Sequence, residues 1–172
     1  MMINFPKGIK IEDLNLKLEN SESLDEIFEI VKSVVERGLN KHRAGLTLLL
    51  AELPNYIGAY HIVGSNFIVM NQSILNAIKA LAKSRLELNS FIFSILLHEY
   101  LHSLGFINEA QVRSIVIKLC EEYFGSNHLV TKFSQNELFK IYPELKYLGL
   151  GKWGGEFKIV KEFDRSSMPY IN

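Results

Sequence analysis

The chain has 172 residues with 19 basic and 19 acidic side chains, and hydrophobic residues make up 48% of it. This length suits one domain with a substantial core, and the balanced charge excludes the strongly basic surface typical of proteins that bind nucleic acid or membranes. The single cysteine, Cys120, excludes an intrachain disulfide. Neither a secretory signal segment nor an apolar run of membrane-spanning length is found. We therefore expect one cytoplasmic domain over residues 1–172.

The first part of the chain predicts an extended segment followed by a helix. Alternating apolar residues within 1–22 favour short strands or an extended arm. Ser23 and Glu26 have the spacing of a capping box, and the apolar residues that follow recur with helical periodicity as far as Gly38. This helix carries no chemical motif, so we expect it to support the core.

Strand patterns fill the next part of the chain. Residues 46–51 form a short apolar run suited to a buried strand, and residues 59–63 and 67–71 flank a glycine-containing turn, which is typical of a β-hairpin. An amphipathic helix is expected over 73–86. The pattern of elements therefore predicts an α+β fold.

The motif His-Glu-x-x-His lies within residues 89–109, where the surrounding sequence is almost entirely apolar. Asn89 or Ser90 can cap a helix here and Gly105 can end it, so the motif is expected on a buried helix. Residues four apart share one helix face, so His98 and His102 can bind one metal ion. Glu99 would lie beside the ion, where a carboxylate can take a proton from an activated water.

This arrangement resembles the zincin metallopeptidases, strongly over the motif helix and more loosely over residues 59–124. The resemblance implies a small twisted mixed sheet backed by helices, with Zn²⁺ bound by His98 and His102 and with Glu99 as general base. It also implies a peptide or protein substrate hydrolysed by a metal-activated water. The transition-state-stabilising residue and the oligomeric state stay open.

The third metal ligand is predicted from the helix that follows, with Asn108 as its cap and Gly125 as its end. On a helical wheel Glu109 projects within the apolar face, and a carboxylate there is best explained by a buried cation. Gluzincins take a glutamate ligand from such a helix, and Glu109 matches that role, although its spacing from His102 is short. The alternative that needs no metal is a first-turn carboxylate favoured by the helix dipole, which can also pair with Arg113. The longer gluzincin spacing would instead select one of two later residues, Glu121 and Glu122.

A second pattern in the same stretch resembles the metzincins, in which the third ligand follows the glycine by three residues. Asn108 stands at that position, where a neutral amide is a poor zinc ligand. Residues 167–170, Ser-Met-Pro-Tyr, are similar to the methionine turn of that group. We keep the metzincin pattern as the second choice.

The zincin resemblance also implies an edge strand that pairs with an extended peptide substrate. The second strand of the hairpin precedes the motif helix by one helix and matches that strand, which gives five candidate substrate-binding residues: Phe67, Ile68, Val69, Met70 and Asn71.

The role of residues 126–172 is not indicated by a motif, although residues 157–161 alternate like a short strand. A tail lying in the cleft, with Glu162, Asp164 or Tyr170 at the metal, is one hypothesis. For the whole chain we predict a zinc metallopeptidase. The alternatives are a non-catalytic metal-binding domain and a protein-interaction domain in which the motif has no metal.

Overall fold

The computed structural model describes residues 11–165. Within that range the chain forms helices and short strands, and these confirm the predicted α+β class. The elements are, in order, α1 (Ile11–Asn20), α2 (Leu24–Leu39), β1 (Thr47–Ala51), β2 (Ala59–His61), β3 (Phe67–Asn71), α3 (Gln72–Leu81), α4 (Arg85–Ser103), α5 (Glu109–Phe124), α6 (Leu129–Gln135), α7 (Leu138–Ile141), the 3-10 helix η1 (Pro143–Leu148) and β4 (Lys158–Val160).

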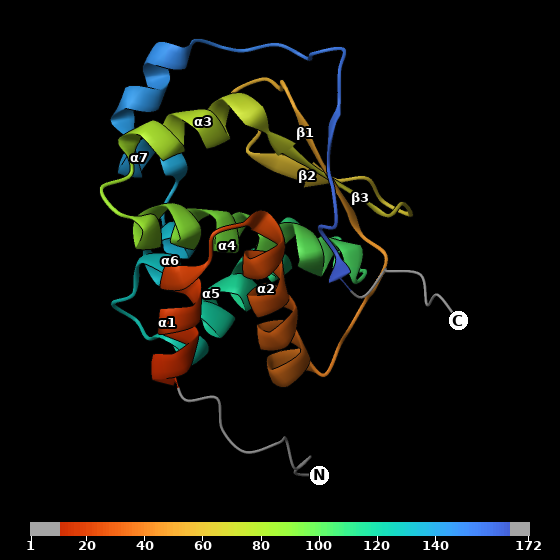
Figure 1. The fold of residues 1–172 in the computed structure, drawn as a ribbon, viewed down its shortest axis with the longest axis vertical. Helices are drawn as coiled ribbons and strands as arrows, with labels where there is room; N and C mark the ends of the chain where they lie inside the picture. The colour runs from red at the N-terminus through yellow and green to blue at the C-terminus, as the bar shows by residue number, and fades with distance from the viewer. Residues whose placement is uncertain (1–10, 166–172) are drawn as a thin grey trace.

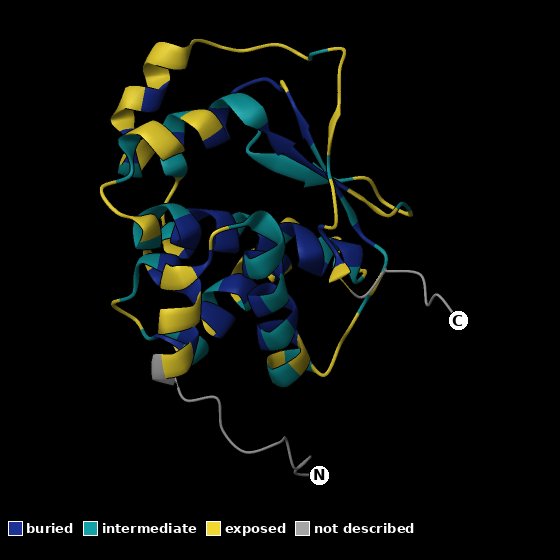
Figure 2. Ribbon diagram, in the orientation of Figure 1, coloured by how far each residue is buried: buried dark blue, intermediate teal, exposed yellow. Residues whose placement is uncertain are grey.

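Helix α4, which carries the His-Glu-x-x-His motif, is the central element of the fold. Figure 1 shows it crossing the middle of the molecule, with the sheet and α3 on one side and α1, α2 and α5 on the other. Most of its side chains are buried, as expected for a helix that is apolar on nearly every face (Figure 2). Its cap lies five or six residues earlier than the sequence suggested, because Ser84 caps the helix by accepting a hydrogen bond from the amide of Glu87. Asn89 instead donates hydrogen bonds to the carbonyls of Leu18 and Ser21.

The N-terminal segment is the clearest error of the sequence prediction. Residues from Ile11 onward form α1 rather than strands, so the extended segment expected over 1–22 is wrong within the described range, and residues 1–10 lie outside it. Leu14 and Leu18 are buried one turn apart, whereas Leu16 between them is exposed. Apolar residues at 14, 16 and 18 fit a strand equally well, and packing against α4 decides for the helix.

The four strands form one mixed sheet in the order β2-β3-β1-β4. β1 and β3 are parallel, and β2 and β4 pair antiparallel with β3 and β1 at the two edges. The predicted hairpin and the predicted strand within 157–161 are both present. One sheet face, with Leu48, Leu50, Ile68 and Met70, belongs to the core that includes α4.

The sheet order corrects the predicted substrate strand. β3, which comprises Phe67, Ile68, Val69, Met70 and Asn71, is an interior strand with both of its sides paired. No further strand can add to it, since its ladder positions are occupied. The edge strand of the hairpin is β2.

The C-terminal tail is held away from the motif as far as it is described. Asp164 is buried, and it accepts hydrogen bonds from Lys32 at 2.8 Å and from the amide of Leu46 at 3.1 Å. The hypothesis that Asp164 reaches the metal is therefore wrong. Glu162 is exposed, and Tyr170 lies outside the described residues. Among the described residues, no helix combines the length and hydrophobicity needed to cross a bilayer.

Asn71 connects the sheet, α3 and the loop that precedes β2. Its side-chain oxygen caps α3 through the amides of Ser73 and Ile74. Its amide nitrogen lies 3.0 Å from the carbonyl of Ile57 and 3.3 Å from those of Leu53 and Pro54. This residue is completely buried, so it fixes the loop at 53–57 from within.

We expect Asn71→Ala to lower the free energy of unfolding by roughly 2–3 kcal/mol, because it removes a helix cap and leaves buried carbonyl groups without a donor. Chemical denaturation measures this loss. Asn76→Ala, at an exposed position of the same helix, is the matched control and should change the stability by less than about 0.5 kcal/mol. Equal effects of the two substitutions would contradict the role given to Asn71.

Candidate metal centre

The two motif histidines meet on one face of α4, as their spacing predicts. The Nε2 atoms of His98 and His102 lie 3.2 Å apart. Both side chains are partly buried near the C-terminal end of the helix. Their nitrogens are therefore directed at one point outside the helix.

Glu109, the first residue of α5, brings a carboxylate to the same point. Its Oε2 lies 3.0 Å from Nε2 of His98, and its Oε1 lies 2.9 Å from Nε2 of His102. The prediction that Glu109 joins the two histidines is confirmed as a placement. The reason given for it is wrong, since the Glu109 side chain is 75% exposed rather than directed into the core. Among the described residues Arg113 makes no ion pair with Glu109, so that part of the metal-free alternative is not formed, whereas Glu109 does stand in the first turn of α5, where the helix dipole favours a carboxylate.

The turn between α4 and α5 produces this meeting. Gly105 has a φ of 100°, a conformation that disfavours other residues, and it follows the last turn of α4. Asn108 then starts α5 by accepting a hydrogen bond from the amide of Gln111 at 2.9 Å. Because α5 begins directly after a tight reversal, its first side chain lies against the last turn of α4.

The hydrogen bonding of His102 indicates which of its ring nitrogens is available to bind a cation. Nδ1 of His102 lies 2.7 Å from the carbonyl oxygen of Phe106, which can only accept, so Nδ1 carries a proton. In the neutral ring Nε2 then has a lone pair, and this lone pair faces a carboxylate oxygen of Glu109. Burial lowers the pKa of His98, the effect of the Glu109 charge being smaller and opposite, and this favours the neutral form of that ring. Lone pairs and a carboxylate directed at one point are stabilised by a cation.

The distances suit a small tetrahedral ion. Ligand atoms about 2.0–2.1 Å from zinc at tetrahedral angles lie about 3.3 Å from one another. The distances found here are 3.2 Å between the nitrogens and 2.9–3.0 Å between nitrogens and oxygens. His98, His102 and Glu109 thus form a group that could hold a metal ion with little rearrangement. The hydrogen bond from His102 to Phe106 would orient that ligand, as is usual for metal-binding histidines.

Glu99 lies beside this group in a drier environment. Only 7% of the residue is exposed, and burial raises the pKa of its carboxyl to about 8, with the Glu109 charge acting in the same direction. A hydrogen bond from the backbone of His61 acts the other way and favours the charged form. Glu99 is therefore a buried carboxyl group of raised pKa at the wall of a cavity.

This cavity has a volume of about 640 Å³ and is bounded by α4, α5, α6 and the approach to β2. His98, Glu99 and Glu109 line one end of it, and Arg113, one turn along α5, adds a positive charge. Arg113 and the β2 residues were not identified from the sequence as parts of a site. The one-turn spacing of Arg113 from Glu109 could have indicated that both residues share a face.

β2 presents its free edge to this cavity. The amide of Asn71 donates to the carbonyl of Gly58 at 2.8 Å, and the amide of Ile62 donates to the carbonyl of Phe67 at 3.3 Å. In an antiparallel pair alternate residues bond to the partner strand, so the backbone groups of Ala59 and His61 point away from β3. Ala59 lines the cavity itself.

The other candidate ligands are not brought to the centre. Asn108 is occupied as the cap of α5, which makes the metzincin arrangement incompatible with this helix start. Glu121 and Glu122 are exposed near the opposite end of α5, and Glu121 accepts a hydrogen bond from Gln135. Residues 167–170, with the similarity to a methionine turn, lie outside the described range.

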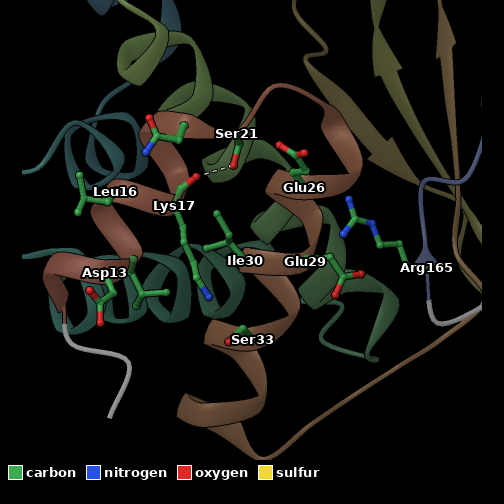
Figure 3. Close-up of a pocket in the computed structure, with 11 residues that line it drawn as sticks. Asp13, Leu16, Lys17, Ser21, Glu26, Glu29, Ile30, Ser33 and Arg165 are labelled. Carbon is green, nitrogen blue, oxygen red and sulfur yellow. Dashed lines mark hydrogen bonds between the residues drawn. The ribbon is translucent and has the colours of Figure 1, made fainter.

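A larger cavity of about 800 Å³ lies between α1 and α2 and is separate from the motif (Figure 3). Lys17, Glu26, Glu29 and Arg165 surround it with charges of both signs. It contains neither a histidine nor any residue of the candidate centre, so it offers no comparable chemistry.

Comparisons with protein-family models, with curated proteins and with solved structures found no match for this chain. The assignment of chemistry therefore depends on the geometry of the site.

We predict that the purified protein binds one Zn²⁺ per chain through this centre. His98→Ala and His102→Ala should each weaken zinc binding more than about 100-fold. Loss of a residue that only orients a ligand already weakens metal binding about 10–100-fold, and these variants lose the ligand itself. Glu109→Ala should weaken it as well, because it removes the third donor. Competition against a chromophoric chelator measures the affinities.

Glu122→Ala is the control for these variants, since it removes an exposed carboxylate from the same helix. It should leave the affinity unchanged. Zinc binding that survives loss of both histidines would show that the ion is held elsewhere.

Proposed function

We propose that this protein is a zinc-dependent peptidase of the zincin type, with His98, His102 and Glu109 as metal ligands and Glu99 as general base. The observation that carries the proposal is the meeting of three metal-ligand side chains beside a buried carboxyl group of raised pKa. That combination is found where water is activated for hydrolysis. Bound zinc would supply Lewis acidity, lowering the pKa of a water molecule and polarising the substrate carbonyl.

Glu99 would carry the proton transfers. It lies next to His98 in the sequence and lines the same cavity, but it is not one of the three converging donors. As a carboxylate it would take a proton from the attacking water, and as a carboxylic acid it would give that proton to the leaving amine. The hydrogen bond from the backbone of His61 favours the charged form that starts this cycle.

The substrate would bind as an extended strand along the free edge of β2. The backbone groups of Ala59 and the carbonyl of His61 offer hydrogen bonds to any sequence, which is the physical basis of strand addition, while the backbone amide of His61 donates to Glu99. This transfers the role expected for β3 to its neighbour. Because Ala59 lines the cavity that holds His98 and Glu99, a peptide paired there would pass beside the metal centre.

Glu99→Gln should reduce peptide hydrolysis by at least about 10²-fold, because the amide cannot act as a base. Zinc content and thermal stability should stay near those of the unchanged protein. Cleavage of a quenched fluorescent peptide library measures the effect, with Glu122→Gln as the control. A zinc-loaded protein that cleaves no peptide would instead favour a non-catalytic metal-binding domain, and full activity of Glu99→Gln would exclude the mechanism.

Ala59→Pro tests the edge strand. Its amide points away from β3, so proline removes a donor to the substrate while the sheet keeps its ladder. We expect kcat/KM to fall about five- to tenfold, as one backbone hydrogen bond contributes about 1 kcal/mol.

Tyr60→Pro is the matched control for the edge strand, since residue 60 pairs with Val69 of β3. It should lower the melting temperature, whereas Ala59→Pro should lower it much less. Unchanged kcat/KM for Ala59→Pro would contradict strand addition at β2.

A further inference from the structure

The cavity at the metal centre continues into two others. A second cavity of about 380 Å³ shares six of its lining residues with the first, namely Tyr56, Gly58, Ser94, Ile95, Phe133 and Asn136. A third, of about 250 Å³, shares Asn55, Tyr56 and Phe139 with the second. We call the three together the groove. It begins at the metal centre and ends beside Leu150.

The walls of the groove become apolar away from the metal. Along α4 the lining residues recur at helical spacing from His98 back to Ile95, Ser94 and Phe91. The opposite wall consists of Phe133 from α6 and Leu138 and Phe139 from α7, with Ile74 of α3 also contributing. Side chains of this kind bind large aliphatic or aromatic groups.

The rim of the groove exposes apolar side chains to solvent. Tyr56 is 76% exposed, Leu150 is 87% exposed, and Phe139 is 42% exposed. Each of them lines the third cavity. Clustered exposed apolar residues beside a cavity mark a binding surface, whereas scattered ones need no explanation.

The direction of a bound peptide follows from the order of residues along β2. Glu99 interacts with the backbone of His61, whereas Gly58 lies against Ile95, one turn back along α4. We take the peptide to pair antiparallel with β2, the more stable of the two pairings, and it then runs from the His61 end toward the Gly58 end. Its residues after the scissile bond would enter the apolar part of the groove.

The length of the groove sets the length of the peptide. Seven residues of α4 separate His98 from Phe91, a distance of about 10 Å, which an extended chain covers with about three residues. The third cavity lies beyond that point. A dipeptide or tripeptide would thus leave the far part of the groove empty.

We propose that the groove binds the segment after the scissile bond of an extended polypeptide that is rich in large apolar side chains. The substrates would be unfolded protein segments or long peptides rather than short ones. This inference depends on the proposed peptidase function for the position of the scissile bond. It commits the groove to one occupant, an extended chain continuing from the free edge of β2.

The test compares quenched fluorescent peptides that are identical before the scissile bond and carry two or six residues after it. We expect kcat/KM to be at least tenfold higher for the six-residue version, provided that it contains Leu or Phe after the scissile bond rather than Ser. In Tyr56→Ser and Phe139→Ser the ratio of the two rates should fall toward one. Ile159→Ser, which changes a 62% exposed apolar residue on β4, should keep the ratio of the unchanged protein.

Binding gives a readout that does not require turnover. Glu99→Gln should bind a fluorescein-labelled six-residue apolar peptide in a polarisation assay, at least tenfold more tightly than its serine analogue. If Glu99→Gln binds the peptide in this way but the unchanged protein cleaves no peptide, the groove proposal stands and the peptidase proposal fails. Cleavage with no dependence on length, on apolar residues or on Tyr56 would overturn the groove, as would an apolar preference confined to residues before the scissile bond. Absence of both binding and cleavage would end both proposals.

Discussion

The candidate site depends on the tight reversal between α4 and α5. Within residues 104–108 the chain reverses at Gly105, and the carbonyl of Phe106 accepts a hydrogen bond from Nδ1 of His102. The next helix then begins at the Asn108 cap. These contacts fix the ring of one histidine and at the same time place Glu109 opposite both histidines. Ligand orientation and ligand position therefore have one origin. The amide of Phe106 also donates to the carbonyl of Leu101 at 3.3 Å, which ties the turn to the helix that it follows.

The placement of the two motif histidines on one face of α4 could be predicted from the sequence, since it depends on local geometry. Residues four apart on a helix share a face in any surroundings, and His98 and His102 do so here. The apolar flanks made burial of the helix equally predictable. The position of Glu109 was predicted with less justification. A helical wheel placed it toward the core, whereas it is exposed, and it meets the histidines because the turn folds α5 back. A wheel contains no information about the turn that precedes it.

The arrangement of the sheet could not be obtained in this way. The individual strands were recognisable, but their order depends on pairings between distant segments, such as β1 with β3 in parallel and β1 with β4. The first pairing makes β3 interior and leaves β2 at the edge. The same limit applies to α1, where Leu14 and Leu18 fit either a strand or a helix until α4 provides a surface for them. Non-local contacts decide both cases.

Two regions with no chemical motif line much of the cavity space beside the candidate site. The loop at 53–58 and the short helices α6 and α7 contain no residue that a motif would single out, yet they form much of the groove beside His98 and Glu99. Asn71 fixes this loop from the core side. Asn55, within the loop, fixes the segment that follows η1 by donating a hydrogen bond to the carbonyl of Gly149 at 3.0 Å. A catalytic group can be recognised by its residue type, because its chemistry depends on few atoms. The shape of a groove depends on many atoms, and here buried side-chain amides contribute to that shape by fixing loops around a central helix.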